Sequence, residues 1–563
     1  YHLGAGPAVI SSRFVERLNF YPGGYPAAFG RFSAGVIGLE TGAPPTDSIR
    51  GELEVDLFRA SALLVVPFDE GRGSIAAAFR RSYYELLLPL VIEGLALSYT
   101  DYQLRADYRA DDHMRLSLFF FGSDDRLDQT GTFGGGIASE GTRNSFGYDF
   151  QRLIAKVDLR LPERVRLTLS GMFGRDGNFF ENASPGTDGL RFALTNTYLA
   201  MRIDTQVPWT EELQTNFGID INAIVFAVDA SAFVPTGLGE YPQPRFTPQE
   251  ATVDMTVVQA LAAFYLEQII RLGPIELSAQ GRFDYMLYAD VAEVFPDPRA
   301  VVRWRVVPEL LLKAATGLFT QPPVAFQVGR IGGNRDLPPN RAWQSSFGVE
   351  LTLPESVELE STFYYSQMFD NSRQTNIVVS TPDGPKRRFF VADEEGRSYG
   401  LEVLLRRRVA EGFYGWLSYT LSRSERRLQD GVWEPFAFDQ THTLNLAASY
   451  AFDGWRFGAA FQLATGRPVD SVVGQPITDT DAVEHDARFR SMGERIPTFH
   501  RLDVRIDRDF DIGPVRGSVY LDVQNVYNAS NNEGILYSFD YSQTAIVPGL
   551  PILPTIGIRG SIQ

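Results

Sequence analysis

Residues 396–400 contain a serine in a sequence pattern that hydrolases use for a nucleophile. They read Gly-Arg-Ser-Tyr-Gly, which matches the Gly-x-Ser-x-Gly pattern. In hydrolases this serine lies on a sharp turn between a strand and a helix, and a histidine and an acid complete the set. Here the pattern opens a segment that alternates like a β-strand, and no convincing Ser/His/Asp set accompanies it. We interpret the match as chance and predict that the protein is not an enzyme.

A second stretch, residues 479–486, gathers carboxylates and one histidine. Carboxylate oxygens can hold Ca²⁺, but the spacing differs from that of an EF-hand, and acidic loops are usually only solvated. We therefore expect no bound metal and no other cofactor. Asp479 and Asp481 remain candidates for contact with a ligand.

Aromatic residues in polar, loop-like stretches are a third possible source of chemistry. Phe179, Phe180 and Trp433 lie in such stretches, and exposed rings there can stack on a ligand. We name them as candidate ligand contacts. His113 and His500 have no obvious partner in the sequence, and we expect both to be structural.

The amino-acid composition excludes several classes of protein. The 563 residues exceed one ordinary soluble core, and the absence of cysteine excludes disulfides and thiolate sites. The net charge of −17 makes nucleic acid an unsuitable partner, because phosphate binding needs a basic surface. No apolar run reaches 18 residues, so a membrane-spanning helix is not supported. The 13% aromatic content is typical of membrane barrels with interfacial aromatic belts.

A two-residue periodicity dominates the chain. Apolar and polar residues alternate in 52–57, 114–120 and 157–161, for example, which predicts strands with one apolar and one polar face. The polar faces carry charges that a packed core would not tolerate but a wet lumen would. A sheet in lipid must also close on itself, because an open edge would leave backbone groups unpaired. The pattern predicts an all-β, transmembrane antiparallel barrel.

Counting the alternating segments predicts about 22 strands. Short turns and long polar connections alternate between them, as in outer-membrane barrels with short periplasmic turns and long outer loops. The even number predicts that both ends of the barrel are periplasmic. Residues 256–270 suit a helix almost as well, but their neighbours favour a strand. The predicted strands are 50–58, 61–68, 73–85, 98–109, 113–124, 146–160, 163–176, 190–207, 210–229, 250–271, 274–288, 297–306, 308–319, 342–353, 355–371, 396–408, 411–424, 437–452, 454–466, 499–511, 513–526 and 554–563.

Residues 1–46 differ from this pattern, because they are rich in Gly and Pro and end at a Pro44-Pro45 hinge. The stretch 15–41 resembles the end of the plug domain of TonB-dependent receptors. The resemblance rests on an acid–arginine strand, a Pro-Gly-Gly turn, a small-residue stretch ending in aromatic-Gly, and a Gly-rich strand. Its marks here are Glu16, Arg17, Pro22, Gly23, Gly24, Gly30 and Gly35.

Further stretches resemble the barrel of the same family in order and spacing, and together they cover nearly the whole chain. They are 321–323, 337–344, 398–402, 438–442, 465–468, 495–503 and 522–528. The resemblance implies a C-terminal part of a plug in 1–46 and a barrel in 47–563. Two features depart from the family pattern. The earlier plug and its TonB-binding segment would lie before Tyr1, and the chain stops at Gln563 without the usual terminal aromatic residue.

The resemblance also implies a function, namely energised import of a scarce siderophore, cobalamin, glycan or peptide across the bacterial outer membrane. The implied partners are outer-membrane lipid, the TonB complex through the N-terminal segment missing here, the small-molecule or peptide ligand, and an outer-membrane lipoprotein or other protein. It further implies that Glu16 and Arg17 pair with charges on the barrel wall, the alternative being an exposed strand pair. The alternative function is a binding or structural barrel that transports nothing and is part of a larger assembly.

Overall fold

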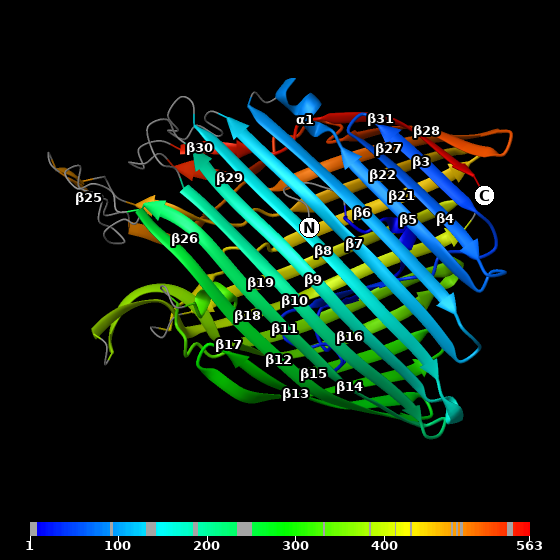
Figure 1. The fold of residues 1–563 in the computed structure, drawn as a ribbon, viewed down its shortest axis with the longest axis horizontal. Coiled ribbons are helices and arrows are strands. Elements are labelled where there is room, and N and C mark those ends of the chain that lie inside the picture. The colour runs from blue at the N-terminus through cyan, green and yellow to red at the C-terminus, as the bar shows by residue number, and fades with distance from the viewer. Residues whose placement is uncertain are drawn as a thin grey trace.

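The computed structural model describes residues 8–90, 94–130, 142–183, 190–233, 250–329, 333–381, 384–410, 412–427, 431–473, 477–479, 482–484, 488–537 and 544–562. Its main body is a closed barrel of tilted antiparallel strands (Figure 1). The wall strands are β3 (Arg50–Asp56), β4 (Arg59–Phe68), β5 (Gly73–Ser82), β6 (Leu95–Arg109), β7 (Met114–Thr130), β8 (Arg143–Arg160), β9 (Arg166–Ala183), β10 (Leu190–Pro208), β11 (Leu213–Phe233), β12 (Glu250–Leu272), β13 (Ile275–Tyr288), β14 (Val291–Val307), β15 (Leu310–Gln321), β16 (Asn340–Leu353), β17 (Val357–Thr381), β18 (Gly384–Ala410), β19 (Phe413–Arg427), β21 (His442–Phe452), β22 (Trp455–Ala464), β27 (Phe499–Ile512), β28 (Val515–Gln524) and β31 (Leu553–Ile562).

Short elements lie in the connections between these strands. The sheet pairs among them are β23 (Pro468–Val473) with β26 (Arg488–Arg495), β24 (Ile477–Asp479) with β25 (Ala482–Glu484), and β29 (Asn532–Tyr537) with β30 (Thr544–Pro548). Strand β20 (Trp433–Pro435) pairs with the far end of β19. The helical turns are η1 (Ser12–Phe14), α1 (Tyr84–Leu87), η2 (Leu88–Leu90), η3 (Pro162–Arg164), η4 (Ala325–Gln327) and η5 (Pro354–Ser356). Within the described residues, none of the helices is long and apolar enough to cross a membrane.

The barrel closes where its first and last strands meet. Gly51 of β3 pairs with Ile562 of β31, and the pairing continues to Asp56 opposite Gly557. With β20 counted as an addition to β19, the ring has 22 strands, so the predicted barrel and its strand number are confirmed. The segment 256–270 is a strand, as predicted, and belongs to β12.

Several predicted loops were wrong in part, because strands continue into them. Strands β17 and β18 run on to Thr381 and back from Gly384, where 372–395 was expected to be a loop, and β9 and β11 extend to Ala183 and Phe233. Backbone pairing maintains these extensions beyond the alternating part of the wall. Once both faces of a strand meet water, no apolar alternation is needed, and the sequence signal disappears.

Alternation sets the two faces of the wall. On β6, Asp101, Gln103 and Arg105 are buried toward the lumen, whereas Leu104 between them is 49% exposed on the outside. The luminal face therefore carries the buried charges of this protein, and the outer face carries large apolar side chains suited to lipid.

Residues 8–46, called here the luminal segment, lie inside the barrel (Figure 1, dark blue). Strands β1 (Val15–Tyr21) and β2 (Val36–Thr41) form an antiparallel hairpin within it. The backbone N–H of Ser11 donates to Gln103 on β6, and that of Ser33 donates to Gln321 on β15. Because these strands are far apart in the ring, the luminal segment crosses the lumen.

Candidate functional site: the contact between the luminal segment and the wall

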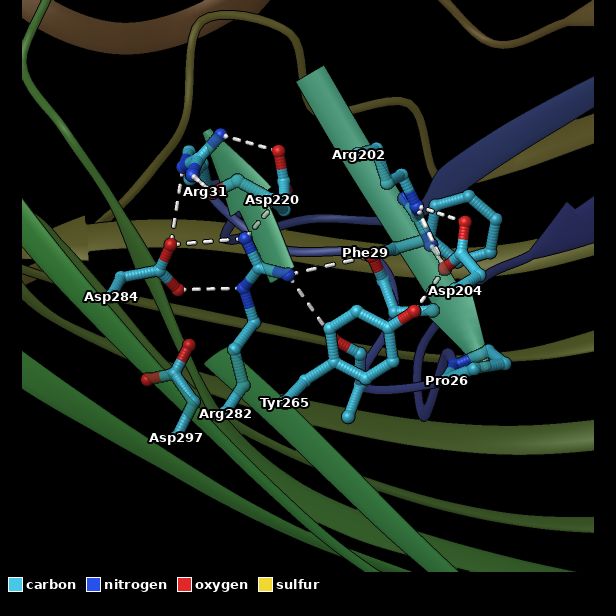
Figure 2. Close-up of polar contacts among 12 residues, drawn as sticks. Pro26, Phe29, Arg31, Arg202, Asp204, Asp220, Tyr265, Arg282, Asp284 and Asp297 are labelled. Atoms are coloured by element: carbon cyan, nitrogen blue, oxygen red, sulfur yellow. Dashed lines mark hydrogen bonds and ion pairs between the residues drawn. The ribbon is translucent and has the colours of Figure 1, made fainter. Parts of the chain in front are cut away.

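Charged side chains of two neighbouring strands gather where the luminal segment meets the wall. Arg282 and Asp284 are two residues apart on β13, so they share one face. Asp297 and Arg299 are likewise two apart on β14, and the register places Arg282 opposite Asp297. All four face the lumen, and their side chains are 0% or 1% exposed. We call these four residues, with Asp220 of β11 and Arg31, the anchor cluster. Figure 2 labels its members other than Arg299.

Arg31 brings the luminal segment into this cluster. Its Nε lies 3.1 Å from Asp284 Oδ1, and its Nη1 lies 3.2 Å from Asp220 Oδ1 (Figure 2). Its Nη2 also donates to the backbone carbonyl of Asp220. One arginine of the luminal segment thus joins two wall strands that are remote in sequence.

Arg282 completes the charge balance from the side of the wall. Its Nε donates to Asp284 at 2.7 Å, and its Nη2 donates to Asp220 at 2.8 Å. Its Nη1 donates to the carbonyls of Ala27 and Ala28 in the luminal segment, at 3.2 and 3.4 Å. A buried guanidinium requires such paired carboxylates, because an unpaired charge away from water is costly.

Arg299 holds the backbone of the luminal segment directly. Its Nη1 lies within hydrogen-bond distance of three carbonyls, those of Tyr25, Pro26 and Phe29. Its guanidinium lies 4.7 Å from the ring centroid of Tyr25 and 4.4 Å from that of Phe319 on β15, which is cation–π geometry. The chain between Tyr25 and Phe29 is therefore bound to the wall through its main-chain carbonyls.

Two glycines of the plug-like motif allow this close approach. A Cβ on Gly30 would overlap the guanidinium of Arg282, which is fully buried and cannot yield. Gly24 has a φ of +61°, and a Cβ there would overlap Ala315 of the wall. Only glycine satisfies both positions without strain. The spacing of glycines in the sequence thus corresponds to points where the luminal segment touches the barrel.

A second polar group flanks the anchor cluster. Arg202 on β10 binds Asp204 through both carboxylate oxygens, at 2.8 to 2.9 Å, and the hydroxyl of Tyr265 donates to the same aspartate. The ring of Phe29 lies 5.7 Å from the Arg202 guanidinium. Figure 2 shows Phe29 of the luminal segment beside Arg202 and Asp204.

Tyr25 shows how strongly this contact excludes water. The residue is fully buried, and its hydroxyl donates to the carbonyl of Phe32. Burial raises the pKa of the Tyr25 phenol above its ordinary value, although the Arg299 charge beside it acts the other way. The phenol therefore stays neutral at physiological pH.

The acid–arginine pair predicted at the start of the plug-like motif takes no visible part in this contact. Glu16 and Arg17 lie on β1 with exposed side chains. Among the described residues, the ion pairs between the luminal segment and the wall come from Arg13, to Glu52, and from Arg31. Pro22, Gly23 and Gly35 lie at the turns of the luminal segment, and Gly23 is close to Gln344 of β16.

Two of the predicted aromatic contacts lie on a wall strand, and the third lies on the short β20 within a connection. Phe179 and Phe180 belong to β9, so their placement in a loop was wrong, and Phe180 packs 4.7 Å from Phe146 across the pair. Trp433 belongs to β20, with the guanidiniums of Arg397 and Arg427 at 4.2 and 4.7 Å from its ring. Contact of these rings with a ligand stays a prediction.

The remaining sequence candidates are dispersed. Asp479 ends β24, its side chain is not among those described, and Asp481 lies outside the described residues. Ser398 lies within the continuous strand β18, so the strand–turn–helix of a hydrolase nucleophile is not formed there. His113 is exposed in a turn, and His500 shares a hydrogen bond with Tyr527 at 2.8 Å.

Sequence reasoning missed the anchor cluster, although one signal was present. Arginine and aspartate occur two residues apart on several predicted strands, which puts both charges on one face. The pairs are Arg105 with Asp107, Arg202 with Asp204, Arg282 with Asp284, Asp297 with Arg299, and Arg505 with Asp507. Such pairs mark luminal faces, but they do not tell which of them the luminal segment reaches.

Comparison with known proteins agrees with the fold. The family model described as TonB dependent receptor-like, beta-barrel matches residues 93–526. Similar solved structures include FpvA of P. aeruginosa bound to a heterologous ferric pyoverdine, with a TM-score of 0.75 and 12% identity over 98% of this chain and 76% of that one. They also include the unliganded ferric citrate transporter FecA (TM-score 0.70, 16% identity, 99% and 84% covered) and the copper transporter OprC (0.68, 12%, 98% and 86%).

At these identities the structural likeness shows the fold alone, and no curated protein matches the sequence. The family model, however, covers well over half of the chain. The 22-strand ring and the apolar outer face are consistent with that match. The protein therefore belongs to the TonB-dependent receptor-like β-barrel family of the outer membrane.

Proposed function

We propose that this protein imports a scarce solute across the outer membrane with energy delivered through TonB. In this proposal, residues 1–46 are the C-terminal part of a plug domain that closes the barrel formed by 47–563. Both ends of the barrel lie on the periplasmic side, where the short turns are. The observation that carries the proposal is the anchor cluster, which holds the luminal segment across the lumen.

The bonds in this contact suit a plug segment that must detach from the barrel wall during transport. Among the described residues, the buried apolar clusters that join the luminal segment to the wall are small, one around Phe14 with Val65 and one around Tyr25 with Phe319. The other ties are hydrogen bonds and ion pairs, whose partners water can replace once the segment shifts. A pulling force therefore has mainly polar contacts to break, and the wall remains closed by its own backbone pairing.

The solute class is part of the proposal. The family resemblance leaves siderophores, cobalamin, glycans and peptides open, and the similar structures include receptors for ferric complexes and a copper transporter. Metal chelates are thus the first class to test. Phe179, Phe180, Trp433, Asp479 and Asp481 are proposed as ligand contacts at the outer end of the barrel.

The proposal can be tested by measuring which solutes cells that express the protein remove from a mixed medium. This tests several solute classes in one experiment. The full encoded gene is expressed in two Gram-negative strains that differ only in tonB. The medium contains ferric citrate, ferric pyoverdine, copper(II), cobalamin and a peptide and glycan digest, and mass spectrometry follows every component. At least one component should disappear faster in the tonB-positive strain, with an empty vector as the control. Equal depletion in both strains would contradict TonB-dependent import and favour the alternative, a binding or structural barrel that transports nothing.

A further inference from the structure

The outer face of β18 and β19 carries arginines where its apolar residues end. Leu401 of β18 is 37% exposed and lies on the face that meets lipid. Arg397 is four residues before it and shares that face, because side chains alternate along a strand. On β19 the same reasoning places Arg423 and Arg427 on the outer face with the exposed Leu421. These arginines project from the outside of the barrel and not into the lumen, so no plug residue would cover them.

These arginines lie at the level where the apolar band of the wall ends. Between Arg397 and Arg407, the outer face of β18 carries a tyrosine and aliphatic side chains, namely Tyr399, Leu401, Val403 and Leu405. At roughly 3.3 Å per residue and a strand tilt of about 40°, the stretch from 397 to 407 rises about 25 Å along the barrel axis. This is the height of the apolar band in an outer-membrane barrel. Arg397 therefore lies at the membrane surface beside the long connections, and Arg407 lies at the opposite surface.

Two carboxylates that pair with these arginines are shared and are almost fully covered. Glu425 binds both Arg397 and Arg423, at 2.6 and 3.1 Å. Asp439 binds both Arg423, at 3.5 Å, and Arg495 of β26. The side chains of Glu425 and Asp439 are 9% and 0% exposed, whereas those of the three arginines are 31–36% exposed. The surface therefore presents guanidiniums, with the acids behind them.

Arg427 adds a fourth guanidinium, and its partner Glu395 lies at 2.6 Å and is itself exposed. Among the described residues, four guanidiniums are thus paired with three carboxylates, which leaves one positive charge in excess. The Nε of Arg397 donates to Glu425, and neither of its Nη atoms has an acceptor among the described residues. We call these four residues the outer arginine patch: Arg397, Arg423, Arg427 and Arg495.

We propose that the outer arginine patch binds the phosphorylated headgroup of an outer-leaflet lipid. The molecules beside a barrel at the membrane surface are lipids, so the anion that meets this patch is a headgroup. Guanidiniums bind phosphate through paired N–H donors, and basic residues at this level attract anionic headgroups. The ring of Tyr399 lies beside Arg397, 5.9 Å from guanidinium to ring centroid, where interfacial aromatic residues are usual. The assignment to the outer leaflet rests on the barrel orientation in the proposed function, whereas the binding itself does not.

The other end of the same strand face supplies a matched control. Arg407 is half-buried like Arg397, and its partner Glu355 lies at 3.7 Å. Arg407→Gln therefore removes the same charge from the same face, but at the opposite membrane surface. Arg397→Gln leaves no buried carboxylate unpaired, because Glu425 keeps its ion pair with Arg423. Both variants should fold, and the change in mobility of the barrel on heating, seen by electrophoresis, checks this.

The test is native mass spectrometry of the purified full chain in uncharged detergent, titrated with three separate probes. Diphosphorylated lipid A has phosphates and acyl chains, digalactosyldiacylglycerol has acyl chains and an uncharged sugar headgroup, and inorganic pyrophosphate has phosphates alone. Lipid A should bind saturably and at least about tenfold more tightly than either other probe, because it alone supplies both parts. Arg397→Gln should weaken lipid A binding about tenfold or more, through loss of charge-assisted hydrogen bonds. Arg407→Gln should change it less than about twofold, since the two sites are distant.

Arg427→Gln is the second variant, because its only carboxylate partner, Glu395, is exposed and can be solvated by water. It should also weaken lipid A binding, by a smaller factor. A lipid A affinity no greater than that of the galactolipid or of pyrophosphate overturns the proposal. Unchanged binding in both Arg397→Gln and Arg427→Gln, or an equal loss in Arg397→Gln and Arg407→Gln, also overturns it. The titration needs neither TonB nor energy, so its outcome is independent of the depletion assay that tests import.

Discussion

Replacing Arg299 with Met should weaken the hold of the wall on the luminal segment while leaving the segment's own hairpin intact. The Nη1 of Arg299 serves three carbonyls of the luminal segment but carries only two hydrogens. Two charge-assisted bonds at the lower end of their usual range give about 3 kcal/mol, and this is the expected loss in docking free energy. Met fills much of the same volume, so the effect is that of lost polar contacts and not of a cavity.

Amide hydrogen exchange of the purified protein measures this loss. The N–H of Ser33 donates to Gln321 of the wall only while the luminal segment is docked. When opening is fast and reversible, the exchange rate follows the opening equilibrium, so about 3 kcal/mol corresponds to roughly 150-fold faster exchange. The readout is mass spectrometry of the peptide that contains Ser33.

Arg303→Met is the matched control for this experiment. Arg303 lies on the same strand and face as Arg299, but it pairs with Glu276 of the wall and not with the luminal segment. It should leave exchange at Ser33 within a factor of about three, as expected for distant sites whose effects are independent. Unchanged exchange in Arg299→Met, or an equal acceleration in both variants, would refute the role assigned to Arg299.

Two further predictions concern the same contact. Gly30→Ala should accelerate exchange in the luminal segment at least about fivefold, because overpacking against the buried Arg282 costs about 1–3 kcal/mol. Gly38→Ala is its control, since a Cβ there meets its nearest neighbour at an ordinary 3.8 Å, and a similar acceleration in both would count against the steric explanation. The raised pKa of Tyr25 predicts that its contribution to docking is complete below about pH 10 and is lost as pH rises through the raised value. Absorbance near 295 nm should show that Tyr25→Phe removes one phenol that titrates above the range of an ordinary phenol, and loss of an ordinary phenol instead would contradict the burial argument.

The barrel was predictable because its signal is repeated. Each wall strand must place one face in lipid, so alternation returns in every crossing, and the even count follows from closure. Even the ambiguous segment 256–270 was assigned correctly, because its neighbours were strands. The loops were less predictable, since the outer ends of β9, β17 and β18 are held by backbone pairing that leaves no apolar pattern.

The anchor cluster was not predictable from one sequence. Arg31 is separated from Asp220 by 189 positions and from Asp284 by 253. Their meeting depends on how the luminal segment crosses the lumen, which no local pattern encodes. The glycines of the plug-like motif were recognised, but their contacts with Arg282 and Ala315 appear only once the wall is closed.

The central claim is that the luminal segment must leave the wall for a solute to pass. A reversible disulfide between the two tests it directly, and the chain has no cysteine to interfere. A Cβ on Gly23 would lie 4.0 Å from the Cβ of Gln344, which is within the range of disulfides. In Gly23→Cys/Gln344→Cys, the TonB-dependent depletion of the medium should stop under oxidation and return with a reductant, while each single variant transports in both conditions. Equal depletion by the oxidised and reduced double variant would contradict the claim.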